Sequence, residues 1–208
     1  MQPGLDAGID ALGVALSRAQ RDQLAGYLAL LDKWNRTYNL TAIRDATRMV
    51  THHALDALAV LPHLPQAADL RVIDVGTGGG IPGVPLAIAR PDWHVALLDA
   101  NHKKGAFLTQ ATIELGLANA NVVVSRVEDY APAAGFDIVV SRAFAELAAF
   151  VAGALHLAAP DGKLYAMKAA VPHDELAALP SHVHVVSTNT ISVPGLDAQR
   201  SLVVIARR

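Results

Sequence analysis

The stretch Asp74-Val75-Gly76-Thr77-Gly78-Gly79-Gly80-Ile81-Pro82-Gly83 decides the fold of this 208-residue chain. It follows a short apolar run and precedes a helix that Pro82 can open at its first turn. Glycines let a backbone turn sharply and approach a ligand closely, but each one costs conformational entropy. A simple turn does not need four glycines in the five positions 76–80. We therefore interpret the stretch as a ligand-binding turn between a strand and a helix.

From residue 70 onward, short apolar runs alternate with helical stretches such as 103–115 and 145–157. This alternation predicts an α/β fold of the Rossmann-like kind, with a mostly parallel seven-stranded sheet and helices on both faces. The last two runs are joined only by a turn around Pro194 and Gly195, so we expect an antiparallel hairpin at the sheet edge. The predicted strands are Arg71–Val75, His94–Leu98, Asn121–Val124, Phe136–Val140, Lys163–Met167, His182–Ser187 and Ser201–Ala206.

Residues 1–65 are expected to form a helical extension, and residues 66–208 to form the ligand-binding domain. Ser17 and Gln20 have the spacing of a capping box, which marks the start of a helix. Behind them apolar side chains recur at helical spacing. A second helix is predicted over residues 45–61, because a proline follows it at once.

The composition is typical of a globular protein, with 52% apolar and 17% charged residues. The chain has no cysteine, which excludes disulfides, thiolate metal sites and cysteine nucleophiles. No secretory signal is visible, and the alanine-rich segment 143–160 contains Glu146 and His156, so we expect a cytoplasmic protein that does not enter membranes. The net charge of −2 means that any contact with nucleic acid must come from a local basic patch.

The glycine stretch fits one nucleotide-binding pattern better than another. In the dinucleotide fingerprint G-x-G-x-x-G that starts at Gly76, the third glycine falls on Ile81. A frame that starts at Gly78 begins too far after the strand. The pattern D-x-G-x-G-x-G, which runs from Asp74 to Gly80, resembles the first motif of Rossmann-like methyltransferases. A phosphate loop is excluded because no Lys-Ser or Lys-Thr follows.

The second predicted strand leads to a carboxylate, Asp99, which lies 23 residues after Gly76. An acid at this place can accept hydrogen bonds from ribose hydroxyls. The alternative is that Asp99 caps the helix that starts near Lys103. The glycine loop favours ribose binding, although Asp99 alone does not separate NAD from S-adenosyl-L-methionine.

Basic residues follow several predicted strands, at the edge where an open parallel sheet binds its ligands. Arg126, Arg142 and Lys168 all stand there, on a chain with only 17 lysines and arginines. No Ser/His/Asp arrangement and no clustered metal ligands stand out. Methyl transfer to a neutral ring nitrogen needs no strong base, so catalysis can be mostly positioning, which supplies on the order of 7–11 kcal/mol.

With these motifs, the sequence resembles the bacterial 16S ribosomal RNA guanine-N7 methyltransferase family, once named glucose-inhibited division protein B. The similarity runs over nearly the whole chain and is most specific where N-L-T-A-I, at residues 39–43, joins the glycine stretch. The resemblance implies S-adenosyl-L-methionine-dependent methylation of a guanosine at N7, expected at guanosine 527 of 16S rRNA. Further residues that carry it are Trp34-Asn35, His53, Asp56, Pro85, Asn101, Lys103, Lys104, Phe107, Leu108, Arg126-Val127-Glu128, Ser141-Arg142-Ala143 and Met167-Lys168.

The resemblance also implies roles for single residues. Val127 and Glu128 would contact the adenosine end of the cofactor, and Arg142 would be the catalytic residue at the methyl-transfer end. We expect no metal, a monomer, and 16S rRNA within the small ribosomal subunit or its precursor as partner. The cofactor-binding residues expected are Asp74, Gly76, Thr77, Gly78, Gly80, Ile81, Asp99, Val127, Glu128 and Arg142, and the RNA-binding residues Lys103, Lys104, Arg126 and Lys168. The chain departs from the family at Ala57, Ala100, Ala169 and His52.

Several alternatives stay open at this point. The domain could bind a nucleoside and assist ribosome assembly without turnover. It could also be a small NAD-dependent oxidoreductase, although the sequence lacks the Tyr-x-x-x-Lys pair of such enzymes. Arg142 could instead form a structural salt bridge with Asp137 or Glu146. Trp34 and Tyr38 could stack on RNA bases, but Trp34 continues the apolar helical stripe and is expected in the core. Arg44 and Arg48 fit a solvated helix face better than an RNA contact.

Overall fold

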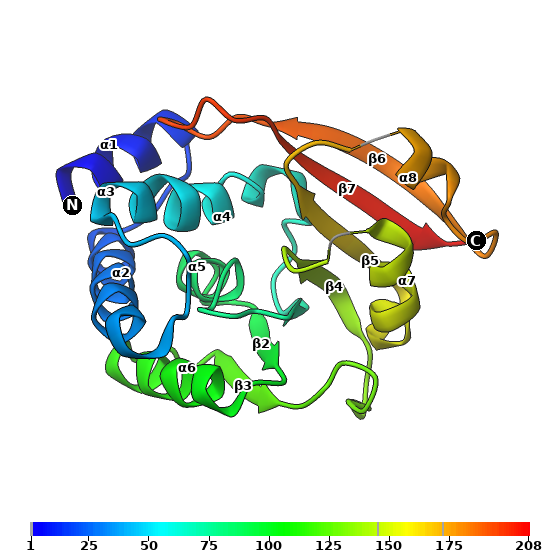
Figure 1. The fold of residues 1–208 in the computed structure, drawn as a ribbon, viewed down its shortest axis with the longest axis horizontal. Coiled ribbons are helices and arrows are strands. Elements are labelled where there is room, and N and C mark those ends of the chain that lie inside the picture. The colour runs from blue at the N-terminus through cyan, green and yellow to red at the C-terminus, as the bar shows by residue number, and fades with distance from the viewer. Residues whose placement is uncertain (1, 145, 172) are drawn as a thin grey trace.

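The computed structural model describes residues 2–144, 146–171 and 173–208. One twisted sheet with helices on both faces makes up the molecule (Figure 1). Its strand order is β3-β2-β1-β4-β5-β7-β6, with the neighbours from β3 to β5 parallel and β7 antiparallel to both β5 and β6. The predicted Rossmann-like class and the terminal hairpin are therefore confirmed. The strands are β1 (Arg71–Val75), β2 (His94–Asp99), β3 (Ala120–Val124), β4 (Phe136–Ser141), β5 (Ala158–Lys168), β6 (Val183–Ile191) and β7 (Arg200–Arg207).

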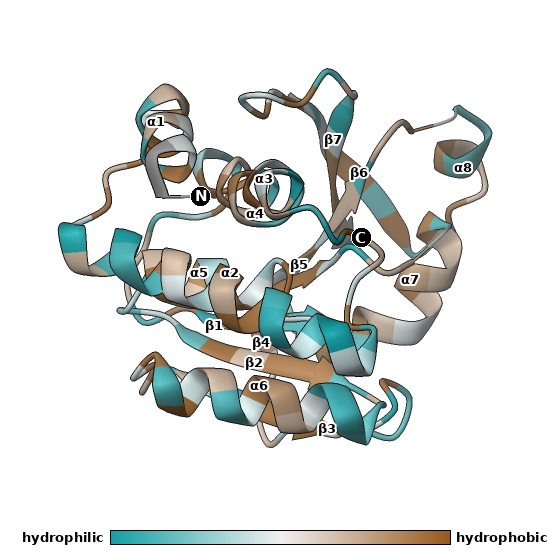
Figure 2. Cartoon of the chain, turned by 60° about the vertical axis from the view of Figure 1, so that its left-hand side comes forward, coloured by the Kyte–Doolittle hydropathy of each residue, from teal (hydrophilic) through white to brown (hydrophobic). Residues whose placement is uncertain are grey.

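The alternation of side chains along the strands divides the core into two apolar clusters. In β1, Val72 belongs to the cluster beneath α2 (Arg18–Tyr38), while Ile73 and Val75 belong to the cluster beneath α7 (Leu147–Ala154). Figure 2 shows the apolar central strands beneath helices whose outer faces are more hydrophilic. The other helices are α1 (Gln2–Leu12), α5 (Gly83–Ala89), α6 (His102–Glu114), α8 (His173–Ala177) and the short 3-10 turns Leu61–His63 and Leu155–Leu157.

Helix α2 begins where the capping box predicts. The Ser17 side chain accepts the Gln20 amide, and the Gln20 side chain accepts the Ser17 amide in return. The helix ends at Asn39, which adopts a left-handed conformation with φ of 50°. Its apolar face joins the same core cluster as Val72 of β1, so the helical extension packs on one face of the sheet. The division at residue 65 stays a prediction.

The predicted helix over residues 45–61 is one helical segment with an irregular middle. It consists of α3 (Ala46–Met49), a π-helical turn (Val50–Leu55) and α4 (Asp56–Leu58). A π-turn inserts one residue into a helix and often marks a functional site. Two polar side chains are buried here among apolar ones: His53 within the π-turn, and Asp56 at the start of α4.

The predicted helix over residues 145–157 corresponds to α7 and the 3-10 turn after it, while its first residue, Ala145, lies outside the described residues. Residues 125–135, between β3 and β4, form a loop in place of a crossover helix. Among the described residues no helix is both long and apolar enough to cross a membrane.

Candidate functional site

The glycine loop after β1 turns through three left-handed residues. Gly76, Gly78 and Gly80 have φ of 69°, 61° and 91°. A Cβ atom added at Gly76 would lie 2.8 Å from the Cβ of Ala143, so this glycine permits close packing against the loop after β4. At Gly78 the nearest atom to an added Cβ is the Gly76 carbonyl oxygen, 3.9 Å away, so the space in front of this position is almost empty. The loop therefore exposes backbone where a side chain would stand in the way of a ligand.

Asp74 holds this loop from beneath. Its side chain is fully buried, and its Oδ2 accepts hydrogen bonds from the Thr77 hydroxyl at 2.6 Å and the Gly83 amide at 2.7 Å. Burial raises the pKa of the Asp74 carboxyl to about 6. Gly80 shapes the loop through its packing: an added Cβ would lie 2.6 Å from Val84 Cγ2, so no side chain fits there. Both residues shape the loop without facing the cavity in front of it.

Asp99 stands at the end of β2, opposite the loop. Its Oδ2 accepts the Gly78 amide at 2.9 Å, and its Oδ1 accepts the Asn101 amide at 2.9 Å. The cap of α6 is Asn101, whose side chain accepts the amides of Lys103 and Lys104, so the interpretation of Asp99 as the helix cap is wrong. The Asp99 carboxylate couples the glycine loop to β2 and keeps 8% of the residue exposed.

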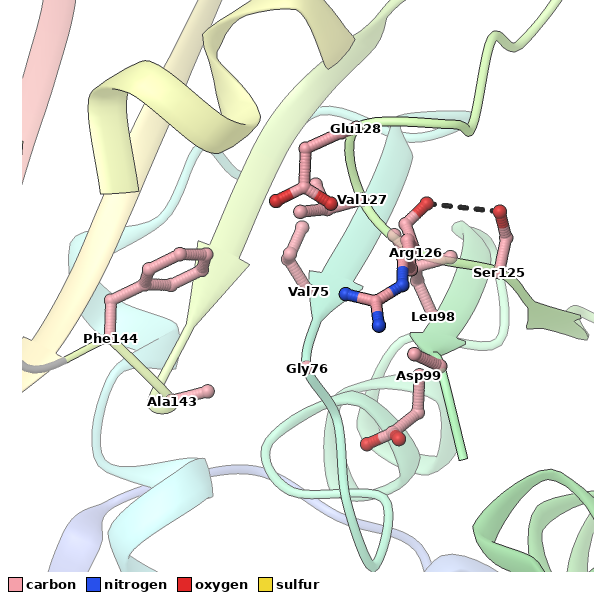
Figure 3. Close-up of a pocket in the computed structure, with 11 residues that line it drawn as sticks. Val75, Gly76, Leu98, Asp99, Ser125, Arg126, Val127, Glu128, Ala143 and Phe144 are labelled. Carbon is pink, nitrogen blue, oxygen red and sulfur yellow. Dashed lines mark hydrogen bonds between the residues drawn. The ribbon is translucent and has the colours of Figure 1, made fainter. Parts of the chain in front are cut away.

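A first cavity, which we call the β2 pocket, lies between these strand ends and the loop before β4 (Figure 3). Its volume is about 250 Å³. In Figure 3 the Arg126 guanidinium reaches toward the space between Gly76 and Asp99, while Glu128 stands at the opposite rim. The Ser125 hydroxyl donates to the Arg126 carbonyl at 2.9 Å and so fixes the loop. The pocket is lined by Val75, Gly76, Leu98, Asp99, Ala100, Ser125, Arg126, Val127, Glu128, Ala143 and Phe144.

Two further cavities adjoin it. The loop cavity, of about 150 Å³, is lined by the glycine loop and shares Gly76 and Ala143 with the β2 pocket. It shares Thr41 and Arg142 with a larger cavity of about 520 Å³, which we call the α4 pocket. The three cavities therefore adjoin one another along the carboxyl edge of the sheet, with Arg142 between the last two. The α4 pocket is lined by Thr41, Ala42, Ile43, His52, His53, Asp56, Arg142, Phe144, Met167, Lys168, Ala169 and Arg200.

The segment that contains N-L-T-A-I forms one wall of these cavities, and α2 holds it in place. The buried Asn35 side chain donates to the Ile43 carbonyl at 3.1 Å and accepts the Thr41 amide at 2.9 Å. The Tyr27 hydroxyl donates to the Gly79 carbonyl at 2.6 Å, which ties the same helix to the glycine loop. The helical extension thus positions both the N-L-T-A-I segment and the glycine loop.

His53 in the π-turn is a neutral acceptor. Its Nδ1 lies 2.9 Å from the His52 carbonyl, so this nitrogen carries the proton, and Nε2 accepts the Thr41 hydroxyl at 3.0 Å. Burial, and secondarily the charge of Arg142, lowers the pKa of His53 to about 4. The imidazole therefore anchors the wall of the α4 pocket near neutral pH without adding charge.

Arg142 is held toward the α4 pocket by two acceptors. Its Nη1 donates to the His52 carbonyl at 2.7 Å and to Asp56 Oδ2 at 3.1 Å. The prediction of a structural salt bridge to Asp137 or Glu146 is wrong about the partner, because the ion pair joins Arg142 to Asp56 on α4. Proximity in the sequence misled that prediction, since Asp137 instead accepts a backbone amide.

Asp56 and Arg200 are the site residues that sequence reasoning missed as a pair. The buried Asp56 carboxylate receives Arg142 on Oδ2 and Arg200 Nε on Oδ1, the latter at 3.0 Å. Arg200 is the first residue of β7, 144 positions from Asp56. No local pattern signals such a pair, although Asp56 is among the residues that carry the family resemblance.

The predicted basic residues do follow the strand ends, but they are not equally available. Lys103 and Arg126 are exposed. Lys104 Nζ pairs with Asp99 at 3.4 Å, and Lys168 Nζ pairs with Glu175 at 2.6 Å. Two of the four expected RNA contacts are therefore engaged with carboxylates of the same chain.

The comparisons with known proteins identify the family. A profile of the family described as rRNA small subunit methyltransferase G matches residues 20–203. The chain belongs to this family. Proteins called Ribosomal RNA small subunit methyltransferase G are 52% identical in Laribacter hongkongensis, over 98% of this chain and 97% of that protein, and 54% identical in Chromobacterium violaceum, over 96% and 94%.

Solved structures agree in fold. Coclaurine N-methyltransferase bound to N-methylheliamine and SAH superposes with a TM-score of 0.60 at 10% identity, over 99% of this chain and 93% of that one. TrmN from Thermus thermophilus gives 0.56 at 18% identity, over 73% and 48%. As a member of the rRNA small subunit methyltransferase G family with this class I fold, the protein is a methyltransferase whose cofactor is S-adenosyl-L-methionine. The NAD-dependent alternative is wrong.

The residues present fit this cofactor. The β2 pocket combines apolar walls from Val75, Leu98 and Phe144 with the Asp99 carboxylate, as a base and its ribose require. The open space at Gly78 leaves room for the cofactor's chain beyond the ribose. Among the described residues no group of three or more side chains could hold a metal ion.

Proposed function

We propose that this methyltransferase transfers a methyl group to N7 of a guanosine in 16S rRNA, at guanosine 527. The observation that carries the proposal is the place of Arg142, which lines both the loop cavity and the α4 pocket. The β2 pocket would hold the adenosine of the cofactor and the loop cavity its methionine part, so that the target base enters the α4 pocket. Methyl donor and acceptor then meet beside Arg142.

The cofactor residues follow from this assignment. Val127 and Glu128 would contact the adenine, and Asp99 would accept the ribose hydroxyls. The loop residues Gly76, Thr77, Gly78 and Ile81, which line the loop cavity, would contact the methionine part. Asp74 and Gly80 contribute from behind the loop.

The chemistry asks for orientation more than for proton transfer. S-adenosyl-L-methionine supplies an electrophilic methyl group, and guanine N7 already carries a free lone pair. Arg142 stays protonated and cannot be a base, but its guanidinium offers five donors in a fixed fork that can orient the base. The base gains positive charge as N7 is methylated, and Asp56 offsets the charge of the arginine beside it.

The partner we propose is the small ribosomal subunit or its precursor in the cytoplasm, met by a monomer of this protein. A base inside folded RNA reaches a cavity only when it leaves its stack. Lys103 and Arg126, which are exposed, are the better candidates for phosphate contacts. Lys104 and Lys168 are already paired with carboxylates of the same chain.

The experiment is to map N7-methylguanosine in 16S rRNA from cells that lack this protein. The modification at the target should disappear, and the purified protein with S-adenosyl-L-methionine should restore it on small subunits from those cells. If the modification persists in the mutant cells, the target is wrong. If the protein binds the subunits without consuming the cofactor, it is an assembly factor and not the enzyme proposed here.

A further inference from the structure

The end of α2 and the start of α3 carry exposed basic and aromatic side chains. Residues 32–48 contain four cations and two carboxylates, on a chain whose net charge is −2. Arg44 and Arg48 are exposed on either side of Asp45, the cap of α3. The net charge of this segment is therefore positive, opposite in sign to that of the whole protein. A local excess of positive charge is expected of a surface that binds phosphates.

An aromatic ring lies next to this charge. Tyr38 is 43% exposed, and its ring centroid lies 5.2 Å from that of Trp34. Trp34 in turn contacts Phe107, which is fully buried, at 5.7 Å. The exposed tyrosine thus packs against a ring that contacts the core, so that a base could pack on it without first ordering a mobile side chain.

The same segment is continuous with the α4 pocket. Thr41, Ala42 and Ile43 line that pocket before Arg44, and His52 and His53 line it after Arg48. Arg44 Nη2 donates to Asn39 Oδ1 at 2.8 Å, which ties the arginine to the residue that follows Tyr38 at the end of α2. In Figure 1, α2 and α3 lie together on the side of the molecule away from β6.

We propose that Tyr38, Arg44 and Arg48 form an RNA-binding surface for nucleotides that flank the target guanosine. Tyr38 stacks on a base, and the two arginines bind phosphates. The inference rests on the proposed function, because it takes the α4 pocket as the place of the target base. It adds a contact area on the helical extension to the residues expected at the sheet edge.

The test measures methylation of small ribosomal subunits from cells that lack the protein, at several salt concentrations. Single-stranded RNA contacts contribute a slope of about 0.7 per phosphate to the dependence of log affinity on log salt. Arg44→Gln and Arg48→Gln should each lower that slope by about this amount and raise KM for the subunits. Turnover at saturating subunits and the affinity for S-adenosyl-L-methionine should stay unchanged.

Two comparisons make the test specific. Arg18→Gln removes an arginine that is 73% exposed at the other end of α2, and it should leave KM and the salt slope unchanged. Tyr38→Leu should raise KM by about 5- to 150-fold, the range for loss of one stacked base, whereas Tyr38→Phe should behave like the wild type.

The outcomes distinguish failure of this RNA-binding surface from failure of the proposed function. Normal methylation by the wild type, with KM and salt slope unchanged in the Arg44, Arg48 and Tyr38→Leu variants, would overturn this surface and leave the proposed function intact. Absence of methyl transfer by the wild type would overturn both. Equal effects of Arg18→Gln and Arg44→Gln would show that only general charge matters, which also overturns the surface.

Discussion

Arg142→Lys keeps a positive charge at the junction of the loop cavity and the α4 pocket but removes the fork. In the wild type one nitrogen, Nη1, serves both the His52 carbonyl and Asp56, which leaves the rest of the guanidinium toward the cavities. A single ammonium group that meets the same two acceptors has no second nitrogen with which to orient a base. We therefore expect the chemical step to suffer and the fold to survive.

The magnitudes separate these two effects. Charge-assisted hydrogen bonds contribute about 1.5–3 kcal/mol, but the Arg142 side chain is 32% exposed and lysine keeps part of the pairing. A loss of about 1 kcal/mol lowers Tm by roughly 2–4 °C in a chain of this size. A misplacement of the reacting group by about 1 Å costs on the order of 100-fold in rate.

The assay is single-turnover methylation of small subunits, with cofactor and enzyme saturating, beside calorimetry for cofactor affinity and a thermal melt. Asp56→Asn should reproduce part of the rate loss, because it weakens the anchor of the same arginine. A wild-type rate for Arg142→Lys would refute the orienting role. A collapse of Tm with a rate that recovers at low temperature would instead make Arg142 a structural residue.

Three other changes test the glycine loop and the two carboxylates that contact it. Asp99→Ala should weaken binding of S-adenosyl-L-methionine by roughly 1–3 kcal/mol in calorimetry while circular dichroism stays native, and an unchanged affinity would remove Asp99 from the ribose site. Gly78→Ala should lose cofactor affinity more than Gly116→Ala, which meets similar strain at φ of 65° in open surroundings, and equal affinities would mean that nothing binds in front of Gly78. Asp74, whose pKa burial raises to about 6, gives stability below its unfolded pKa of 3.8 that is lost as pH rises through 6. The Tm of cofactor-free Asp74→Asn should therefore fall less between pH 4 and 8 than that of the wild type, and parallel curves would contradict the raised pKa.

The parts of the site that sequence could predict are those whose cause is local. The glycine spacing and Asp99 follow single strands, and the fold then brings them together, so that Asp99 accepts the amide of Gly78. The motif could not say that Asp74 lies beneath the loop, because the direction of a side chain depends on what packs around it. The proline after residue 61 likewise predicted where the helix over 45–61 ends but not its π-turn, since one inserted residue barely alters an apolar pattern.

The ion pairs of Asp56 lay beyond such reasoning for a different reason. Its two partners are 86 and 144 positions away, and each follows or begins a strand of ordinary composition. Only the fold of the sheet brings the end of β4 and the start of β7 close to α4. The line between what was predictable and what was not therefore follows the sequence separation of the partners.

The insertion of β7 between β5 and β6 has a consequence for synthesis. Within this sheet β6 pairs with β7 alone, so residues 183–191 have no place in the sheet until residues 200–207 have been made. Arg200, at the head of β7, pairs with Asp56, so this ion pair also has to wait for β7 to be made. The strands around the glycine loop and Asp99 are complete by residue 141. A growing chain can therefore form the loop and carboxylate proposed to hold the methyl donor well before it can close the pocket proposed for the base.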